Sequence, residues 1–206
     1  MLSGTGRTLV NLCARISAGS LTARIVVVIS SRADALAVTR ARDFGLKTVI
    51  IERRNMDSEE FQEGLSAAID AASPDLVCMA GFLSLWRVPK RFAGRVINIH
   101  PALLPDFGGR GMYGERVHRA VLAAGRPVSG CTVHYCDNEY DHGPIILQRR
   151  VKVEPNDTPA TLGARVFEQE LAAYPEAIQL FSDGRIRLDG ANVIIDPPGH
   201  VSAPKP

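Results

Sequence analysis

The sequence predicts an α/β fold in which a doubly wound, mostly parallel sheet carries helices on both faces. Strand-like apolar runs alternate with helical segments from residue 7 to residue 100, and such βαβ units build parallel sheets. The chain of 206 residues is 46% hydrophobic, enough for one well-cored domain. Its longest apolar run, IVVVI at 25–29, is far shorter than the ~20 residues of a membrane span.

The helices are predicted from the spacing of apolar residues and from residues that are typical of helix ends. The first places four apolar side chains on one face: Leu9, Leu12, Cys13 and Ile16. The second stops at Gly45, and the third begins at the acidic cluster 57–60, which suits a helix amino terminus. Helices are predicted over residues 7–19, 33–45, 57–72, 115–124 and 158–181.

The strands are mostly continuous apolar runs, as expected where both faces of a sheet are covered. They are predicted over residues 23–30, 47–51, 75–81, 95–100, 130–136, 144–153, 185–188 and 192–195. We find no repeat and no long linker. The sequence therefore predicts a single domain over 1–190, followed by a short β segment and a Pro-rich tail over 191–206.

Charge and cysteine usage narrow the function classes. The 24 basic and 22 acidic residues are interspersed and give a net charge of +2, which favours neither a nucleic-acid groove nor a membrane-binding patch. The four cysteines form no CxxC pair and lack ligand-spaced histidines. We expect a reduced cytoplasmic protein with no metal site.

Two polar side chains stand at the end of an apolar strand in NIHPALLP. Asn98 and His100 are two residues apart, so in a strand they point to the same face. Ligands bind at the carboxyl ends of parallel strands, and Pro101 and Pro105 stiffen the loop that follows. Each residue alone also fits a satisfied strand-end position, but the pair favours a catalytic site.

Asp141 lies in the turn-forming stretch DNEYDHGP. On local sequence alone it is a turn residue. If the fold brings it to His100, its carboxylate would raise the pKa of the imidazole and orient the ring, and its own pKa would fall.

Three other stretches have both a structural and a functional interpretation. LSGTGRTL places Gly4 and Gly6 before a helix, where free N–H groups suit a phosphate, although a flexible tail fits equally well. Glu170 fits a solvated helix position. The apolar residues of MAGFLSLW fit a core, or the pocket of a flat aromatic ligand.

The order GTGRTL, MAGF, NIHPALLP, HGPIILQ and ARVFEQE resembles the phosphoribosylglycinamide formyltransferases, a folate-dependent family of purine synthesis, from Ser3 to about Asp183. The resemblance implies a formyltransferase fold over 1–190 and formyl transfer from the co-substrate 10-formyltetrahydrofolate to phosphoribosylglycinamide. It also implies that the first strand is truncated, because the family begins with an apolar strand before the glycine loop. The sequence leaves a homodimer open.

The resemblance also implies roles for individual residues. The catalytic set is Asn98, His100 and Asp141. The substrate-binding set is Gly6, Arg7, Thr8 and Glu170. The folate-binding set is Leu83, Ser84, Leu85, Trp86, Asn98, Asp137, Asn138, Glu139, Tyr140 and Asp141.

Related formyl-group enzymes offer alternatives. Formyltetrahydrofolate hydrolases carry an additional amino-terminal domain and methionyl-tRNA formyltransferases an additional carboxyl-terminal one, and we expect neither in this chain. A formyltransferase acting on a sugar-nucleotide amine, or an inactive folate- or nucleotide-binding relic, remain the alternatives.

Overall fold

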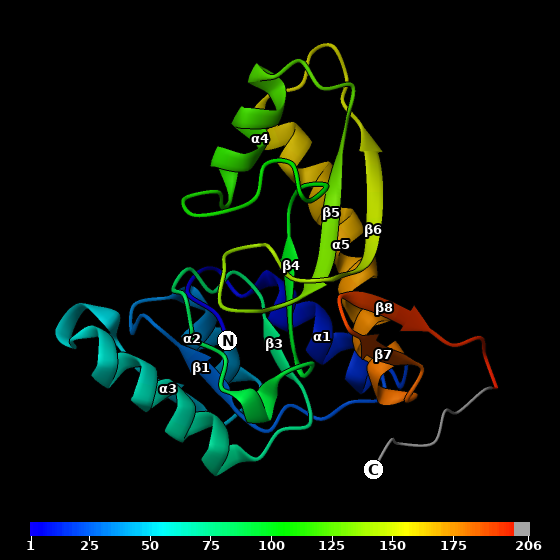
Figure 1. Ribbon diagram of the computed structural model, residues 1–206. Coiled ribbons are helices and arrows are strands. Elements are labelled where there is room, and N and C mark those ends of the chain that lie inside the picture. Colours follow the sequence, from blue (N-terminus) through cyan, green and yellow to red (C-terminus); the bar gives the residue numbers. More distant parts are fainter. Residues whose placement is uncertain (200–206) are drawn as a thin grey trace.

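A computed structural model describes residues 1–199 of the chain (Figure 1). The helices are α1 (Arg7–Ser17), α2 (Leu36–Asp43), α3 (Ser58–Ala72), α4 (Glu115–Ala123) and α5 (Pro159–Ser182), with short 3-10 turns at Arg53–Asn55 and Lys90–Phe92. The strands are β1 (Val28–Ser30), β2 (Thr48–Ile50), β3 (Val77–Met79), β4 (Val96–His100), β5 (Val128–Tyr135), β6 (Ile145–Lys152), β7 (Ile186–Asp189) and β8 (Asn192–Ile195).

The main sheet is parallel in its first half and antiparallel in its second. Strand β1 pairs with β2 and β3 pairs with β4, both in parallel. Strands β5 and β6 then add antiparallel to β4 in the order β3-β4-β5-β6. The predicted mostly parallel, doubly wound sheet is confirmed.

The chain start joins the two parallel parts. Leu2 N–H donates to Ile29 O at 3.0 Å, and Ser3 N–H donates to Gly81 O at 3.0 Å. Ala80 N–H donates to Met1 O at 3.0 Å. Residues 1–3 therefore lie between β1 and β3 and form hydrogen bonds with both sides.

Helices cover both faces of this sheet (Figure 1). Helix α3 packs Phe61, Leu65 and Ile69 against one face, in a cluster that includes strand β3 and Val96. Helices α1, α4 and α5 cover the other face, where Ile97 and Ile99 point. Alternate residues of β4 thus enter opposite cores, as the period of a strand requires.

The predicted helix ends agree with the local chemistry. Asp57 caps α3 by accepting from the N–H groups of Glu59 at 2.7 Å and Glu60 at 2.9 Å, and the Glu60 side chain closes a capping box. Helix α5 contains Pro175 and still runs to Ser182.

Two predicted boundaries do not coincide with the ends of the observed strands. The strand predicted over 23–30 is shorter than expected, because only Val28–Ser30 pair with β2. Strands β7 and β8 form an antiparallel hairpin across the predicted boundary at residue 190. The part of the Pro-rich tail at 200–206 lies outside the described residues, and the division at 190 stays a prediction.

Strand β6 carries an irregularity beside the site. Val133 pairs with Leu147, but the next residue, His134, pairs with Ile145, so Ile146 is an extra residue. Its side chain is buried in the core. None of the helices within residues 1–199 combines the length and apolarity needed to cross a bilayer.

Candidate active site

A cavity of about 730 Å³ opens where the main parallel strands end. Its wall includes the glycine loop before α1, the end of β4, the loop 109–114 and one face of α5. Nine predicted site residues line it: Gly6, Arg7, Thr8, Leu83, Asn98, His100, Tyr140, Asp141 and Glu170. Segments far apart in the sequence thus meet at one cavity, as the carboxyl-end rule for such sheets predicts.

Asn98 is oriented by a histidine on the neighbouring strand. Residues Asn98 and His134 are register partners in the β4–β5 ladder. His134 Nδ1 lies 2.8 Å from the Tyr135 carbonyl, which can only accept, so this nitrogen carries the ring proton. His134 Nε2 is then an acceptor, and the Asn98 Nδ2 amide donates to it at 3.1 Å. The second N–H of Asn98 points at Asp141 Oδ1, 3.4 Å away.

His100 is oriented by the backbone of the loop that follows it. Its Nε2 lies 2.9 Å from the Phe107 carbonyl and must donate to it. The nitrogen that gains or loses a proton is therefore Nδ1, which lies 3.4 Å from Asp141 Oδ2. The predicted meeting of Asp141 with His100 is present in the structure.

Asp141 is held in an unusual backbone conformation. Its φ is 55°, in the left-handed region, and its Oδ2 accepts from Gly109 N–H at 3.0 Å. One carboxylate thus faces Asn98, His100 and the loop at Gly109. This arrangement suits a group that positions other side chains and moves protons.

Burial and direct contacts act in opposite directions on the charges of this pair. Desolvation lowers the pKa of His100 below its ordinary value, and the opposing effect of Asp141 does not overcome it. The expectation of a raised His100 pKa is therefore wrong. For Asp141, burial alone favours the protonated form, but contacts with His134, His100 and Gly109 outweigh it, so its pKa is lowered as expected.

The glycine loop presents the start of α1 to the cavity. Gly6 has φ 74°, and a Cβ there would lie 2.7 Å from Ala37 Cβ, so only glycine fits. No acidic residue stands in the first turn of α1. Its amino-terminal N–H groups and helix dipole are suited to an anion.

Arg7 and Glu170 lie on the same side of the cavity. The Arg7 guanidinium lies 3.7 Å from the centre of the Phe167 ring, which fixes it over α5. Burial raises the pKa of Glu170 to about 8, although the positive charge of Arg7 opposes the shift. The carboxyl group of Glu170 is therefore largely protonated at neutral pH and can donate a hydrogen bond.

The predicted folate residues are divided between the cavity and its support. Leu83 and Tyr140 are exposed and line the cavity. Trp86 is only 1% exposed and packs against Phe92, with its indole N–H donating to Ser66 Oγ at 3.2 Å.

Other predicted folate residues connect the loop at 137–141 to the segment after Trp86. Asn138 Oδ1 accepts from Val88 N–H at 2.8 Å and so ties the loop at 137–141 to the segment after Trp86. Asp137 accepts from the N–H of Glu139 and faces His142 Nδ1, at 2.8 and 2.7 Å. Ser84, Leu85, Asp137, Asn138 and Glu139 are not among the lining residues.

Sequence reasoning assigned no site role to two histidines that the structure places at the site. His134 lies in the predicted strand 130–136, and pairing that strand with 95–100 would have revealed it. His118 also lines the cavity and is buried, with no hydrogen-bond partner for Nδ1 in the described part of the chain.

A network of side-chain hydrogen bonds behind the site was also not predicted from the sequence. Thr132 Oγ1 donates to Ala102 O at 2.6 Å and accepts from Leu104 N–H at 3.0 Å. Gln148 Nε2 donates to Leu104 O at 2.9 Å. The loop after His100 is therefore fixed by side chains from β5 and β6. Within residues 1–199 no cluster of three or more His, Cys, Asp or Glu side chains could hold a metal ion.

Comparison with known proteins gives a consistent result. The family described as Formyl transferase matches residues 1–178. Phosphoribosylglycinamide formyltransferase of Escherichia coli is 35% identical over 191 residues, covering 91% of this chain and 88% of that protein. Its Haemophilus influenzae counterpart is 33% identical over 191 residues with the same coverage, 91% and 88%.

The chain is also similar to part of a longer protein and to a solved structure. The chicken trifunctional purine biosynthetic protein adenosine-3 is 36% identical over 197 residues, and this chain, 94% of which is covered, spans only 19% of its length. The crystal structure of glycinamide ribonucleotide transformylase 1 from Symbiobacterium toebii has a TM-score of 0.88 and 39% identity, covering 95% of this chain and 92% of that one.

Proposed function

We propose, because this chain belongs to the phosphoribosylglycinamide formyltransferase family, that it transfers a formyl group from 10-formyltetrahydrofolate to the amine of phosphoribosylglycinamide in de novo purine biosynthesis. The observation that carries the proposal is one cavity that holds Asn98, His100 and Asp141 together with the glycine loop. Polar donors and an anion site are what the two substrates require.

The reaction needs donors for a developing negative charge. The acceptor amine attacks the formyl carbon, a C–N bond forms, and the carbonyl oxygen becomes an oxyanion. The Asn98 amide can redirect one N–H to this oxygen, because the hydrogen bond that this N–H makes with Asp141 Oδ1 is long, at 3.4 Å. Losing one such donor typically costs ~10²–10³ in rate.

His100 would supply the second donor through Nδ1. In the free protein its lowered pKa favours the neutral ring, with the proton on Nε2. The ring therefore becomes a donor at Nδ1 only by taking up a proton, and the carboxylate of Asp141, 3.4 Å away, stabilises the cation that results.

Asp141 would also serve the proton transfer. The attacking amine loses a proton, and the folate nitrogen must gain one when its bond to the formyl carbon breaks. A carboxylate that lines the cavity can pass this proton on, directly or through water.

The remaining walls would bind the two substrates. The start of α1 and Arg7 suit the acceptor phosphate, and the protonated Glu170 suits the ribose hydroxyls. Leu83 to Trp86 and the loop 137–141 would border the pterin, with Trp86 acting from within the core. A homodimer and a cytoplasmic location stay predictions.

The test is a direct assay of formyl transfer. Purified protein is mixed with phosphoribosylglycinamide and 10-formyltetrahydrofolate, and release of tetrahydrofolate is followed beside formation of the formylated acceptor. A sugar-nucleotide amine serves as competing acceptor. Equal or better use of the sugar nucleotide would reject this acceptor assignment, and folate release without any formylated product would indicate a hydrolase.

A further inference from the structure

Two polar side chains lie beside His100 in one row across the sheet. Thr132 on β5 is the register partner of His100 on β4, and Gln148 on β6 is the register partner of Thr132. Directly opposed residues of antiparallel strands place their side chains on the same face, so the three side chains are neighbours. We call Thr132 and Gln148 the support pair.

The support pair binds the backbone of the loop that follows His100. The Thr132 hydroxyl donates to Ala102 O at 2.6 Å and accepts from Leu104 N–H at 3.0 Å. Gln148 Nε2 donates to Leu104 O and to Thr132 Oγ1, both at 2.9 Å. Ala102 and Leu104 are buried, so these backbone groups would be costly to leave unpaired. Both polar backbone groups of Leu104 thus depend on the support pair.

Leu104 in turn packs against the end of the same loop. A Cβ at Gly108 would lie 2.6 Å from Leu104 Cδ2 and 3.1 Å from Asp141 Cβ, so the glycine makes room for both side chains. The next residue, Gly109, donates its N–H to Asp141 Oδ2 at 3.0 Å. A displacement of Leu104 would therefore reach Asp141 through two consecutive residues.

The carbonyl of Phe107, directly before these two residues, determines where the His100 ring carries its proton. It accepts from His100 Nε2 at 2.9 Å. The competing position for the proton is Nδ1, which could donate to Asp141 Oδ2, 3.4 Å away. If the Phe107 carbonyl moved away, the neutral ring would gain a hydrogen bond only from the second arrangement. The same carbonyl also raises the pKa of His100 against the effect of burial.

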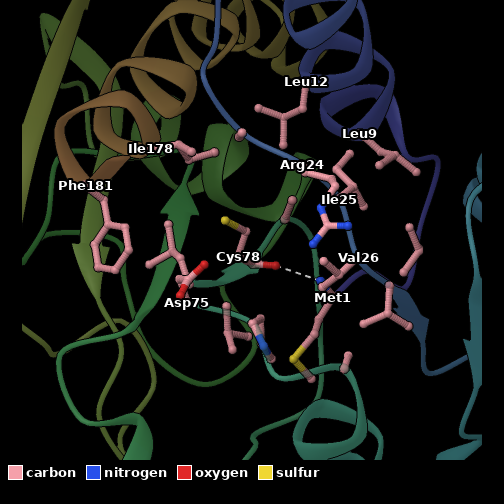
Figure 2. A pocket seen from close by; sticks show the side chains of 18 of the residues that line it. Met1, Leu9, Leu12, Arg24, Ile25, Val26, Asp75, Cys78, Ile178 and Phe181 are labelled. Atoms are coloured by element: carbon pink, nitrogen blue, oxygen red, sulfur yellow. Dashed lines mark hydrogen bonds between the residues drawn. The ribbon is translucent and has the colours of Figure 1, made fainter. Parts of the chain in front are cut away.

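The support pair does not belong to the wall of either large cavity. In the part of the chain that the structure describes, Thr132 and Gln148 line neither the active-site cavity nor a second one, of about 620 Å³ (Figure 2). The second cavity lies between residues 25–28 and residues 75–78. Any influence of the support pair on the reaction must therefore pass through the loop.

We propose that Thr132 and Gln148 are positioning residues, which hold the loop 101–109 so that His100 keeps its ring proton on Nε2 and turns a free Nδ1 to Asp141. The proposal deepens the proposed formyl transfer and rests on it for its functional meaning. With the Phe107 carbonyl displaced, the ring would instead donate from Nδ1 to Asp141, and the imidazolium that serves as second donor would form less readily.

The test removes each polar group of the support pair and keeps its shape. Thr132→Val deletes the hydroxyl, Gln148→Met deletes the amide, and Thr132→Ser keeps a hydroxyl. Thr48→Val on β2 is the matched control, because Thr48 Oγ1 also donates to a backbone carbonyl, that of Leu46 at 3.0 Å. NMR of the ¹⁵N-labelled imidazoles in the free protein reports which His100 nitrogen is protonated. Steady-state kinetics give kcat and KM for both substrates, and thermal melts verify that each variant is folded at the assay temperature.

We expect Thr132→Val and Gln148→Met to move part of the His100 proton from Nε2 to Nδ1. In both variants kcat should fall at least about tenfold while each KM stays within about threefold. Thr132→Ser and Thr48→Val should keep the proton on Nε2 and kcat within about threefold of the unmodified protein.

A ring proton that stays on Nε2 in both variants would overturn the proposal. So would a fall in kcat no larger than that of Thr48→Val, or a rise in KM with kcat unchanged. The NMR measurement needs no substrate. Absence of formyl transfer by the unmodified protein would therefore reject the proposed reaction, while the position of the proton would still decide whether the support pair orients His100.

Discussion

Replacing Asp141 by Asn separates its charge from its shape. The carboxylate lies 3.4 Å from His100 Nδ1 and accepts from Gly109 N–H. Asparagine keeps an oxygen for Gly109 but cannot stabilise an imidazolium. The substitution therefore tests whether the charge, and not the turn geometry at residue 141, supports the reaction.

The size of the effect follows from the distance. Two unit charges 3.4 Å apart attract by ~5 kcal/mol at an effective dielectric of ~20, which is a ceiling because the cavity admits water. A loss of ~3–4 kcal/mol in the transition state corresponds to a fall in kcat of ~10²–10³. The pKa of His100, which Asp141 now raises against burial, should move further down.

The assay combines steady-state kinetics with NMR titration of the labelled histidines. Asp137→Asn is the control for the titration, because Asp137 faces His142 and raises the pKa of that ring. It should shift His142 and leave His100 unchanged. If His100 titrates at the same pH with and without the Asp141 carboxylate, and kcat falls less than tenfold, the coupling described here is wrong.

Four further substitutions test the remaining walls of the cavity. His100→Ala should lower kcat by ~10²–10³ while circular dichroism shows the fold retained; activity within about tenfold would contradict its role. Arg7→Ala should raise KM for the phosphorylated acceptor more than it lowers kcat, and the reverse pattern would exclude a phosphate contact. Glu170, with a pKa raised from 4.5 to about 8, makes the free energy of unfolding fall as pH rises through that window; Glu170→Gln should remove this slope in urea titrations. Gly6→Ala should cost ~1–3 kcal/mol in the same measurement, because its Cβ would collide with Ala37; an unchanged midpoint would refute the clash.

The local sequence pattern was sufficient to predict the features that depend only on local geometry. The two-residue spacing of Asn98 and His100 fixes a common face whatever the rest of the fold does. The acidic cluster at Asp57 caps α3 because the side chain reaches backbone only two and three residues away. The other motifs that accompany NIHPALLP were also recognisable in the sequence, so the fold and nine of the residues that line the cavity were predicted.

Features that depend on distant neighbours were not predicted. His134 meets Asn98 only through the β4–β5 register, which the separate strands do not reveal. The pKa of His100 was expected to rise because its charged neighbour was visible in the sequence but its burial was not. Trp86 fitted an ordinary core position on local sequence, and only the family resemblance placed it in the folate-binding set. Strand β1 is shorter than its apolar run because a ladder needs a partner on its edge.

The extra residue in β6 constrains how the chain can tolerate length changes. Ile146 opposes no residue of β5, so the two strands are offset by one position on either side of it. Deleting it would close the ladder into a regular pairing, in which His134 still faces Ile145 and Val133 still faces Leu147. Gln148 at the loop after His100 and Val151 in the core would keep their faces, and the cost would be the loss of one buried side chain. A deletion at any other position between Leu147 and Val151 would instead shift part of the strand by one residue and turn its side chains to the opposite face. Homologous sequences should therefore tolerate a one-residue gap in β6 at Ile146 more readily than at its neighbours.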